Sequence, residues 1–138
     1  MKTFRCIAAF FLSLACTLAV TDADPVVFNV NMTIERANGH FNPGNGDTVA
    51  ILGLNGDWSS GIAMTSSPTN PNVFTVTNNL SAGSWPNYKF VIKQTDNPWI
   101  WEKPAAFGGE NRYFQVPSGG TNLTVVLFSD NTNSPIPH

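Results

Sequence analysis

The chain has 138 residues, of which 42% are hydrophobic, 12% charged and 12% aromatic, and its formal net charge is -2. This length and apolar content indicate one globular domain and exclude a disordered chain. A protein that binds nucleic acid needs a basic patch, and the seven Lys and Arg residues form no cluster in the sequence.

The N-terminus has the pattern of a secretory signal peptide. Lys2 and Arg5 precede or flank the start of an apolar run at residues 7–20, which is too short to span a bilayer. Small residues make cleavage possible after Ala23 or after Ala19. We expect the mature protein to be secreted and to contact no membrane once the signal peptide is removed.

These signals divide the chain into three parts. We expect residues 1–23 to be the signal peptide, residues 24–130 the folded domain and residues 131–138 a flexible, polar tail. A membrane anchor and lipidation at Cys16 are the alternative interpretations of the leader. Because the two cysteines, Cys6 and Cys16, both lie in this leader, the folded domain depends on its core for stability. We expect it to be a monomer.

Short apolar segments bounded by Gly, Pro, Asn or Asp predict an all-β fold. Such segments, alternating or mostly apolar, occur at residues 26–34, 47–54, 73–77, 88–93, 112–116 and 122–128. Within 88–93, the alternation places Tyr88, Phe90 and Ile92 on one face and Lys89 on the other. No amphipathic helical stretch is visible. The pattern predicts an antiparallel β-sandwich or barrel of about seven to eight strands.

Residues that perform catalysis or bind metals are sparse. The two histidines, His40 and His138, lie far apart, which excludes a Cys/His zinc cluster in the mature chain. Four acids lie in or beside predicted loops: Asp57, Asp96, Glu102 and Glu110. A small glycoside hydrolase stays open as an alternative, because that reaction needs only two carboxylates. Turn capping and surface solvation explain these acids more simply, so we predict no catalytic residue, metal site or cofactor.

The four tryptophans are the informative residues. Trp58 lies in the turn sequence Asn-Gly-Asp-Trp-Ser-Ser, and Trp85 precedes Pro86 in a predicted loop. Trp99 and Trp101 are two residues apart, so in an extended segment both rings project from the same face. A ring that covers the edge of the core explains one such residue more readily than four.

Indole rings held on loops suit sugar binding. The axial C–H groups of a glucose ring form a flat apolar patch that stacks on an indole face, while Asn, Lys or Glu side chains bind the hydroxyls. Stacking two sugar units buries about 100–150 Å² of apolar area, or about 3 kcal/mol. The costs of association offset part of this, so we expect a dissociation constant of roughly micromolar to millimolar.

A series of motifs then resembles a known family. In chain order they are Val49-Ala-Ile-Leu-Gly-Leu-Asn-Gly-Asp-Trp58, Leu80-Ser-Ala-Gly83, Asn87-Tyr-Lys-Phe90, Trp101-Glu102 and Glu110-Asn-Arg-Tyr-Phe-Gln-Val-Pro117. Their order and spacing resemble the starch-binding domain of carbohydrate-binding module family 20, which is related to the glycogen-binding modules of family 48. The resemblance covers about residues 26–128.

The resemblance implies an immunoglobulin-like β-sandwich that binds α-1,4-glucan. By this likeness, Trp58 and Trp101 stack on the sugar, Lys89 of the Tyr-Lys-Phe motif binds hydroxyls, and Asn111 contributes a further contact. The neighbours of the second tryptophan, Trp99 and Glu102, complete the predicted set of carbohydrate-binding residues. Trp85 is a further candidate for lining the site.

The chain departs from the family pattern in several places. Asn87 stands where the family usually has an acid, and the loop at residues 103–110 is long, which can displace Asn111. The loop at residues 66–72 has no aromatic residue, so the family's second sugar site is not carried over, and Phe41 is only a distant candidate for it.

We therefore predict a secreted, non-catalytic protein whose partner is an α-glucan or a related polysaccharide. The alternative is a structural or adhesive β-sandwich that uses its exposed aromatic residues for protein contact. Sugar binding requires Trp58 and Trp101 to be exposed on one face with Lys89 beside them. Sequons at Asn31, Asn79 and Asn122 are no more than the composition predicts by chance, so they carry no inference.

Overall fold

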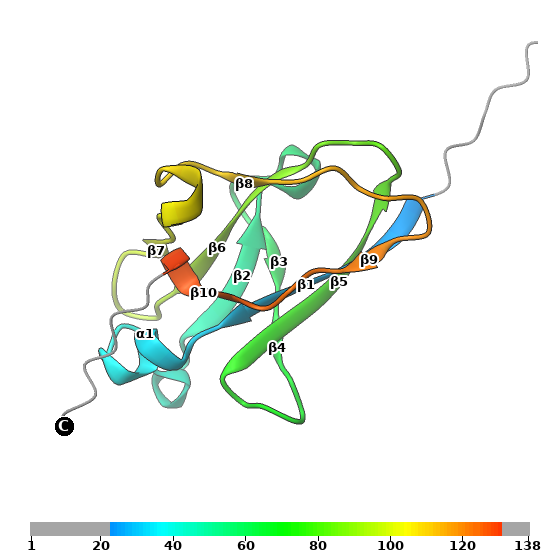
Figure 1. Ribbon diagram of the computed structural model, residues 1–138. Coiled ribbons are helices and arrows are strands. Elements are labelled where there is room, and N and C mark those ends of the chain that lie inside the picture. Colours follow the sequence, from blue (N-terminus) through cyan, green and yellow to red (C-terminus); the bar gives the residue numbers. More distant parts are fainter. Residues whose placement is uncertain (1–22, 131–138) are drawn as a thin grey trace, which may run out of the picture.

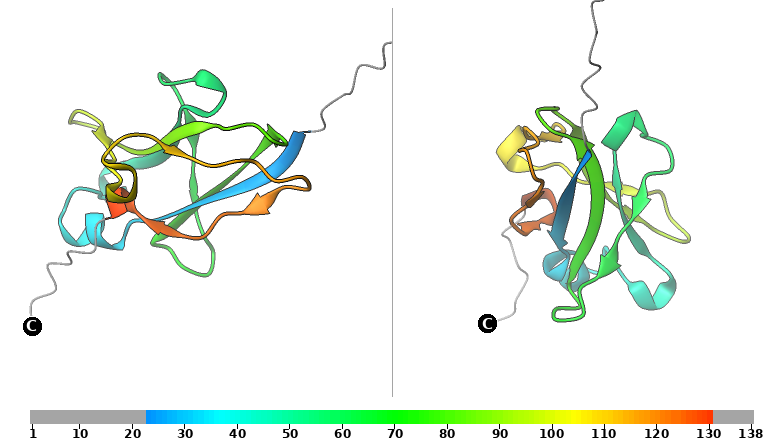
Figure 2. Two further views of the ribbon diagram at one scale, coloured as in Figure 1. Left: turned by 45° about the horizontal axis from the view of Figure 1, so that its top comes forward. Right: turned by 90° about the vertical axis from the view of Figure 1, so that its right-hand side faces the viewer.

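The computed structural model describes residues 23–130 of the chain (Figure 1). The predicted tail at residues 131–138 and all of the predicted signal peptide except Ala23 lie outside these residues. Two β-sheets form separate layers, which the edge-on view on the right of Figure 2 shows with β1 and β5 in one layer. The prediction of an all-β sandwich is confirmed.

The first sheet has the strand order β10-β1-β5-β4, and β9 also pairs with β1. Its strands are β1 (Ala23–Asn31), β4 (Thr65–Ser66), β5 (Val73–Ser81), β9 (Thr121–Asn122) and β10 (Val126–Leu127). Strands β1 and β5 pair antiparallel along their whole length and form the centre of this layer. The pairings of β1 with β9 and β10 are parallel, so the prediction of a wholly antiparallel sandwich is corrected to one mixed sheet.

The second sheet has the order β3-β2-β6-β7, and β8 also pairs with β6. Its strands are β2 (Thr48–Leu52), β3 (Ile62–Ala63), β6 (Asn87–Lys93), β7 (Ile100–Trp101) and β8 (Arg112–Tyr113). The described residues thus contain ten strands rather than seven or eight. The predicted segment at 122–128 is divided into β9 and β10, and the two-residue strands β3, β4 and β7 lie outside the predicted segments.

Short helices occur at the turns. They are α1 (Thr33–Ala37) and the 3-10 turns η1 (Pro43–Asn45), η2 (Leu54–Gly56), η3 (Ala105–Phe107) and η4 (Phe128–Asp130). The first strand was predicted to continue to Ile34, which is wrong. The side chain of Asn31 accepts hydrogen bonds from the backbone N–H and the hydroxyl of Thr33, and this local turn ends the strand and starts α1.

The core lies between the two sheets. Its buried members include Phe28 and Val30 of β1 and Tyr88, Phe90 and Ile92 of β6, as the alternation predicts. Phe28 packs edge-to-face on Tyr88 with ring centroids 5.1 Å apart. Burial raises the pKa of the Tyr88 hydroxyl to about 12, so this ring stays neutral at any physiological pH.

Candidate functional site

On the outer face of the second sheet, apolar side chains of the strands lie next to the sheet, and aromatic side chains lie over them. Val91 of β6 lies opposite Ala50 of β2 and Trp101 of β7, so the three side chains share the face that points away from the core. Lys89, two residues earlier on β6, lies on the same face opposite Leu52. Ala50, Leu52 and Val91 are nevertheless buried, which shows that larger side chains cover this face.

The loop that carries Trp58 folds over this face. Gly61 lies close against Leu52, and Lys93 of β6 donates a hydrogen bond to the carbonyl of Ser60. The rim of the Trp58 ring packs against the backbone of Gly53, at the end of β2. Trp58 is therefore anchored just beyond the pair formed by Leu52 and Lys89.

The carboxylate of Asp57 holds this loop in shape. It accepts hydrogen bonds from the hydroxyls of Ser59 and Ser60 and from the backbone N–H groups of Ser59, Ser60 and Gly61. These bonds, the Ser60 hydroxyl first among them, hold the pKa of Asp57 well below its ordinary value. A carboxylate engaged in this way fixes the turn that presents Trp58.

Trp101 and Trp99 reach the same face from β7 and the turn before it. Trp58, Trp99 and Trp101 are each 38% exposed, so every ring keeps accessible surface. The ammonium of Lys93 lies 4.4 Å from the centroid of the Trp99 ring, a cation–π contact. Since Lys93 also bonds to the Trp58 loop, it links that loop to Trp99.

Lys89 lies on the outer face opposite Leu52, as the alternation along β6 predicts. Its ammonium donates a hydrogen bond of 3.0 Å to the carbonyl of Gly109. Asn111 follows in the same loop and lines a groove with Trp58. The structure thus brings Trp58, Lys89 and Trp101 to one face and places Asn111 at its edge.

Glu102 does not lie at this surface, and its predicted contact with sugar is wrong. Its side chain is fully buried, and its carboxylate accepts the backbone N–H of Phe90 at 2.8 Å. Arg112 forms an ion pair with it at 2.9 Å and a second one with Asp130 at 2.7 Å. Burial raises the pKa of the Glu102 carboxyl, and the hydrogen bond from Arg112 opposes that rise. Glu102 therefore anchors the segment after Trp101 instead of meeting a ligand.

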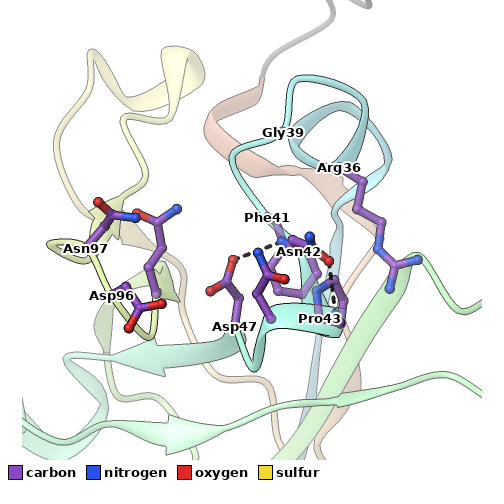
Figure 3. A pocket seen from close by; sticks show the side chains of 11 residues that line it. Arg36, Gly39, Phe41, Asn42, Pro43, Asp47, Asp96 and Asn97 are labelled. Atoms are coloured by element: carbon purple, nitrogen blue, oxygen red, sulfur yellow. Dashed lines mark hydrogen bonds between the residues drawn. The ribbon is translucent and has the colours of Figure 1, made fainter.

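Phe41, the distant candidate for a second sugar site, is also unsuitable, because its side chain is 2% exposed. It lies behind a pocket of about 630 Å³ beside α1 and η1. Figure 3 shows this pocket with Asp47 bonded to the backbone N–H of Asn42 and with Asp96 across the opening. Charged and amide side chains surround this pocket, and its one aromatic residue offers almost no surface for stacking.

A row of aromatic rings was only partly visible in the sequence. Trp85 contacts Tyr113, with ring centroids 6.4 Å apart, and Tyr113 packs edge-to-face on Phe107 at 5.3 Å. Tyr113 could have been found from its position, because alternation after the buried Arg112 points it outward. Phe107 lies in the long loop at residues 103–110, where no sequence pattern marked it as part of this row.

Within residues 23–130, no group of three or more His, Cys, Asp and Glu side chains gathers to hold a metal ion. Over the same residues, no helix has the length and apolar character that a membrane span requires.

A β-sandwich that carries exposed tryptophans around a lysine on the outer face of one sheet has the character of a carbohydrate-binding module. Residues 26–126 match the family model of the starch binding domain, carbohydrate-binding module family 20. The chain belongs to this family. No curated protein matches the chain.

Solved structures show the same fold. The chain is similar to parts of a gamma-CGTase from alkalophilic Bacillus clarkii (24% identity, TM-score 0.55), the glycoside hydrolase family 15 glucoamylase from Hypocrea jecorina (20%, 0.56) and the Hormoconis resinae glucoamylase (21%, 0.56). These alignments cover 76%, 78% and 82% of this chain, but 15%, 17% and 18% of the respective solved chains. The likeness therefore concerns a small part of each of those proteins.

Proposed function

We propose that this protein is a secreted, non-catalytic module that binds α-1,4-glucan on the outer face of its second sheet. The observation that supports the proposal is that Lys89 and Trp101 lie on that face and the loop of Trp58 folds against it, with both rings 38% exposed. The two indoles stack on successive glucose units, and the Lys89 ammonium donates to their hydroxyls. Trp99 and Asn111 extend this contact at its edges.

The state of the acids supports a binding role without catalysis. Two of the four acids that left a hydrolase open are committed to internal contacts, Asp57 within its own turn and Glu102 with Arg112. A glycoside hydrolase needs two carboxyl groups that both reach one glycosidic bond. A fully buried Glu102 cannot reach a polysaccharide. The starch-active relatives, of which this chain matches less than one fifth, give no ground for assigning their reactions to it.

The binding test is a calorimetric titration of residues 24–138 with β-cyclodextrin. We expect a dissociation constant of roughly micromolar to millimolar, and at least a tenfold increase for Trp58→Ala and for Trp101→Ala. The matched control is Val125→Ala, which truncates an exposed apolar side chain in the segment between β9 and β10 of the other layer and should leave affinity unchanged. Thermal melting of each variant shows whether it folds. Wild-type protein that binds no β-cyclodextrin up to millimolar concentration refutes the proposal.

Secretion has its own test. Expression of the full chain followed by N-terminal sequencing of protein in the medium should give a start after Ala23 or after Ala19. Protein that stays with the cells and keeps its leader contradicts the proposal of a secreted module.

A further inference from the structure

A groove of about 540 Å³ lies beside Trp58, where the turns after β2 and β5 meet the start of β6. These turns lie in the upper half of Figure 1. One wall carries Trp58, and Trp85 belongs to the same lining. Trp58 therefore takes part both in the proposed α-glucan site and in this groove, so the two are continuous.

Trp85 is presented to solvent on a firm support. It is 59% exposed, the largest exposure among the tryptophans. Tyr113 contacts its ring at an interplanar angle of 51°, and Phe107 supports Tyr113 from the side. The pairing of β8 with β6 fixes Tyr113 opposite Asn87. A ring held by neighbours loses less conformational entropy on binding than a free one.

The chemistry of the groove favours a neutral polyol. Among the described residues that line it, none carries a formal charge, and its polar groups are the amides of Asn55, Asn87 and Asn111 and the hydroxyls of serines. Amides both donate and accept hydrogen bonds, as sugar hydroxyls do. A charged ligand finds no counter-charge here, in contrast to the pocket of Figure 3, which contains Arg36 and Asp96.

We propose that the groove between Trp58 and Trp85 is an additional subsite, which takes glucose units of the same α-glucan chain beyond those stacked on Trp58 and Trp101. This inference rests on the proposed function, because it needs a chain already held on the outer face. Trp85 lies outside the motifs by which the sequence resembles its family, whereas Tyr113 belongs to the last of them. The protein should therefore prefer long α-glucan chains over short ones more strongly than the Trp58, Lys89 and Trp101 platform alone would.

The test compares a short and a long ligand by calorimetry on residues 24–138. Maltotriose fills the platform alone, and maltodecaose also reaches the groove. We expect Trp85→Ala to leave the dissociation constant for maltotriose within about twofold and to raise that for maltodecaose roughly tenfold, the loss of one stacked sugar. Trp85→Phe keeps a smaller ring and should lose less. Val125→Ala should change neither constant, and melting curves verify the fold of each variant.

Each outcome either supports or overturns the proposed subsite. A long-chain preference that shrinks in Trp85→Ala while maltotriose binding persists supports the subsite. The same ratio of the two constants in wild type and Trp85→Ala overturns the subsite and leaves the proposed function standing. Equal loss of both ligands overturns it too, because Trp85 would then belong to the first platform. Wild-type protein that binds neither ligand overturns both proposals.

Discussion

Gly53 lies directly against the ring of Trp58 and limits where that ring can sit. Its φ of +92° lies in the left-handed region, which favours glycine. A methyl group added there would lie 2.5 Å from Cη2 and Cζ2 of Trp58 and 2.6 Å from the backbone oxygen of Asn87. Carbon atoms in contact are ordinarily about 3.5–4.0 Å apart. Because the Asn87 oxygen belongs to β6 and is hard to move, the indole is what shifts, by about 1 Å.

The size of the effect of Gly53→Ala follows from these contacts. An L-residue in a left-handed conformation costs about 1–2 kcal/mol, and the overpacking adds about 1–3 kcal/mol, so unfolding free energy falls by roughly 2–5 kcal/mol. A domain of ordinary stability remains folded at low temperature after such a loss. If the shifted Trp58 no longer stacks, about half of the ~3 kcal/mol of stacking energy disappears, which raises the dissociation constant roughly tenfold.

Gly56→Ala is the matched control in the same turn. Gly56 has a φ of +79°, yet an added methyl group there meets no atom within 4 Å. It should lose about 1–2 kcal/mol of unfolding free energy from backbone strain alone and keep its affinity for β-cyclodextrin. Urea denaturation and calorimetry at 10 °C measure both quantities. Wild-type affinity in Gly53→Ala, or an equal loss of affinity in Gly56→Ala, refutes the argument that the contact at Gly53 positions the ring.

Three other changes probe the supports of the platform. Glu102→Gln leaves buried Arg112 with one carboxylate partner fewer and should lower the free energy of unfolding by about 3 kcal/mol in urea titrations; an unchanged midpoint contradicts this. Folding lowers the pKa of Asp57. The carboxylate therefore contributes its full stabilisation of the fold above the pKa of the unfolded chain, near 4, and this contribution is lost only as the pH falls through the lower pKa of the folded protein. Calorimetry should therefore give a constant β-cyclodextrin affinity from pH 7 to 4, and a tenfold weakening over that range opposes the assigned role. Lys93→Met removes the cation–π contact with Trp99 and should weaken binding roughly twofold to fivefold by the same assay, whereas unchanged affinity shows that Trp99 needs no such support.

The part of the site on β6 could be predicted from sequence because a strand has a period of two. Buried Tyr88 and Phe90 fix which way Lys89 points, whatever the rest of the chain does. The same rule placed Trp99 and Trp101 on one side of an extended segment, and β7 bears this out for Trp101 and its neighbour Ile100. Local periodicity is sufficient to predict the direction of a side chain wherever that direction depends only on neighbours in the same strand.

Glu102 shows how adjacency in sequence misleads, because the alternation that turns Trp101 outward turns Glu102 inward with Ile100. Next to Trp101 in sequence, it resembles a polar group at the rim of a sugar site. Its side chain instead points inward, because Arg112 returns ten residues later to meet it and Asp130 meets Arg112 from η4. A buried carboxylate is tolerated only with such partners. The loop between Glu102 and Arg112, which contains η3, hides this pairing from any argument based on spacing.

The outer face of the second sheet explains why the aromatic rings proposed to bind sugar also cover apolar residues of the fold. A sandwich sheet ordinarily turns polar side chains outward, yet Ala50, Leu52 and Val91 lie on this face and are buried. The side chains that lie over this face, Trp101 among them, give it cover without any partner bound. An indole lying flat over such a surface has one face inward and leaves the other free for a sugar ring. The fold thus holds the tryptophan rings in place before a glucan binds, so binding loses little free energy in ordering them. The affinity for glucan should therefore depend on the contacts beneath the rings as much as on the contacts between the rings and the sugar.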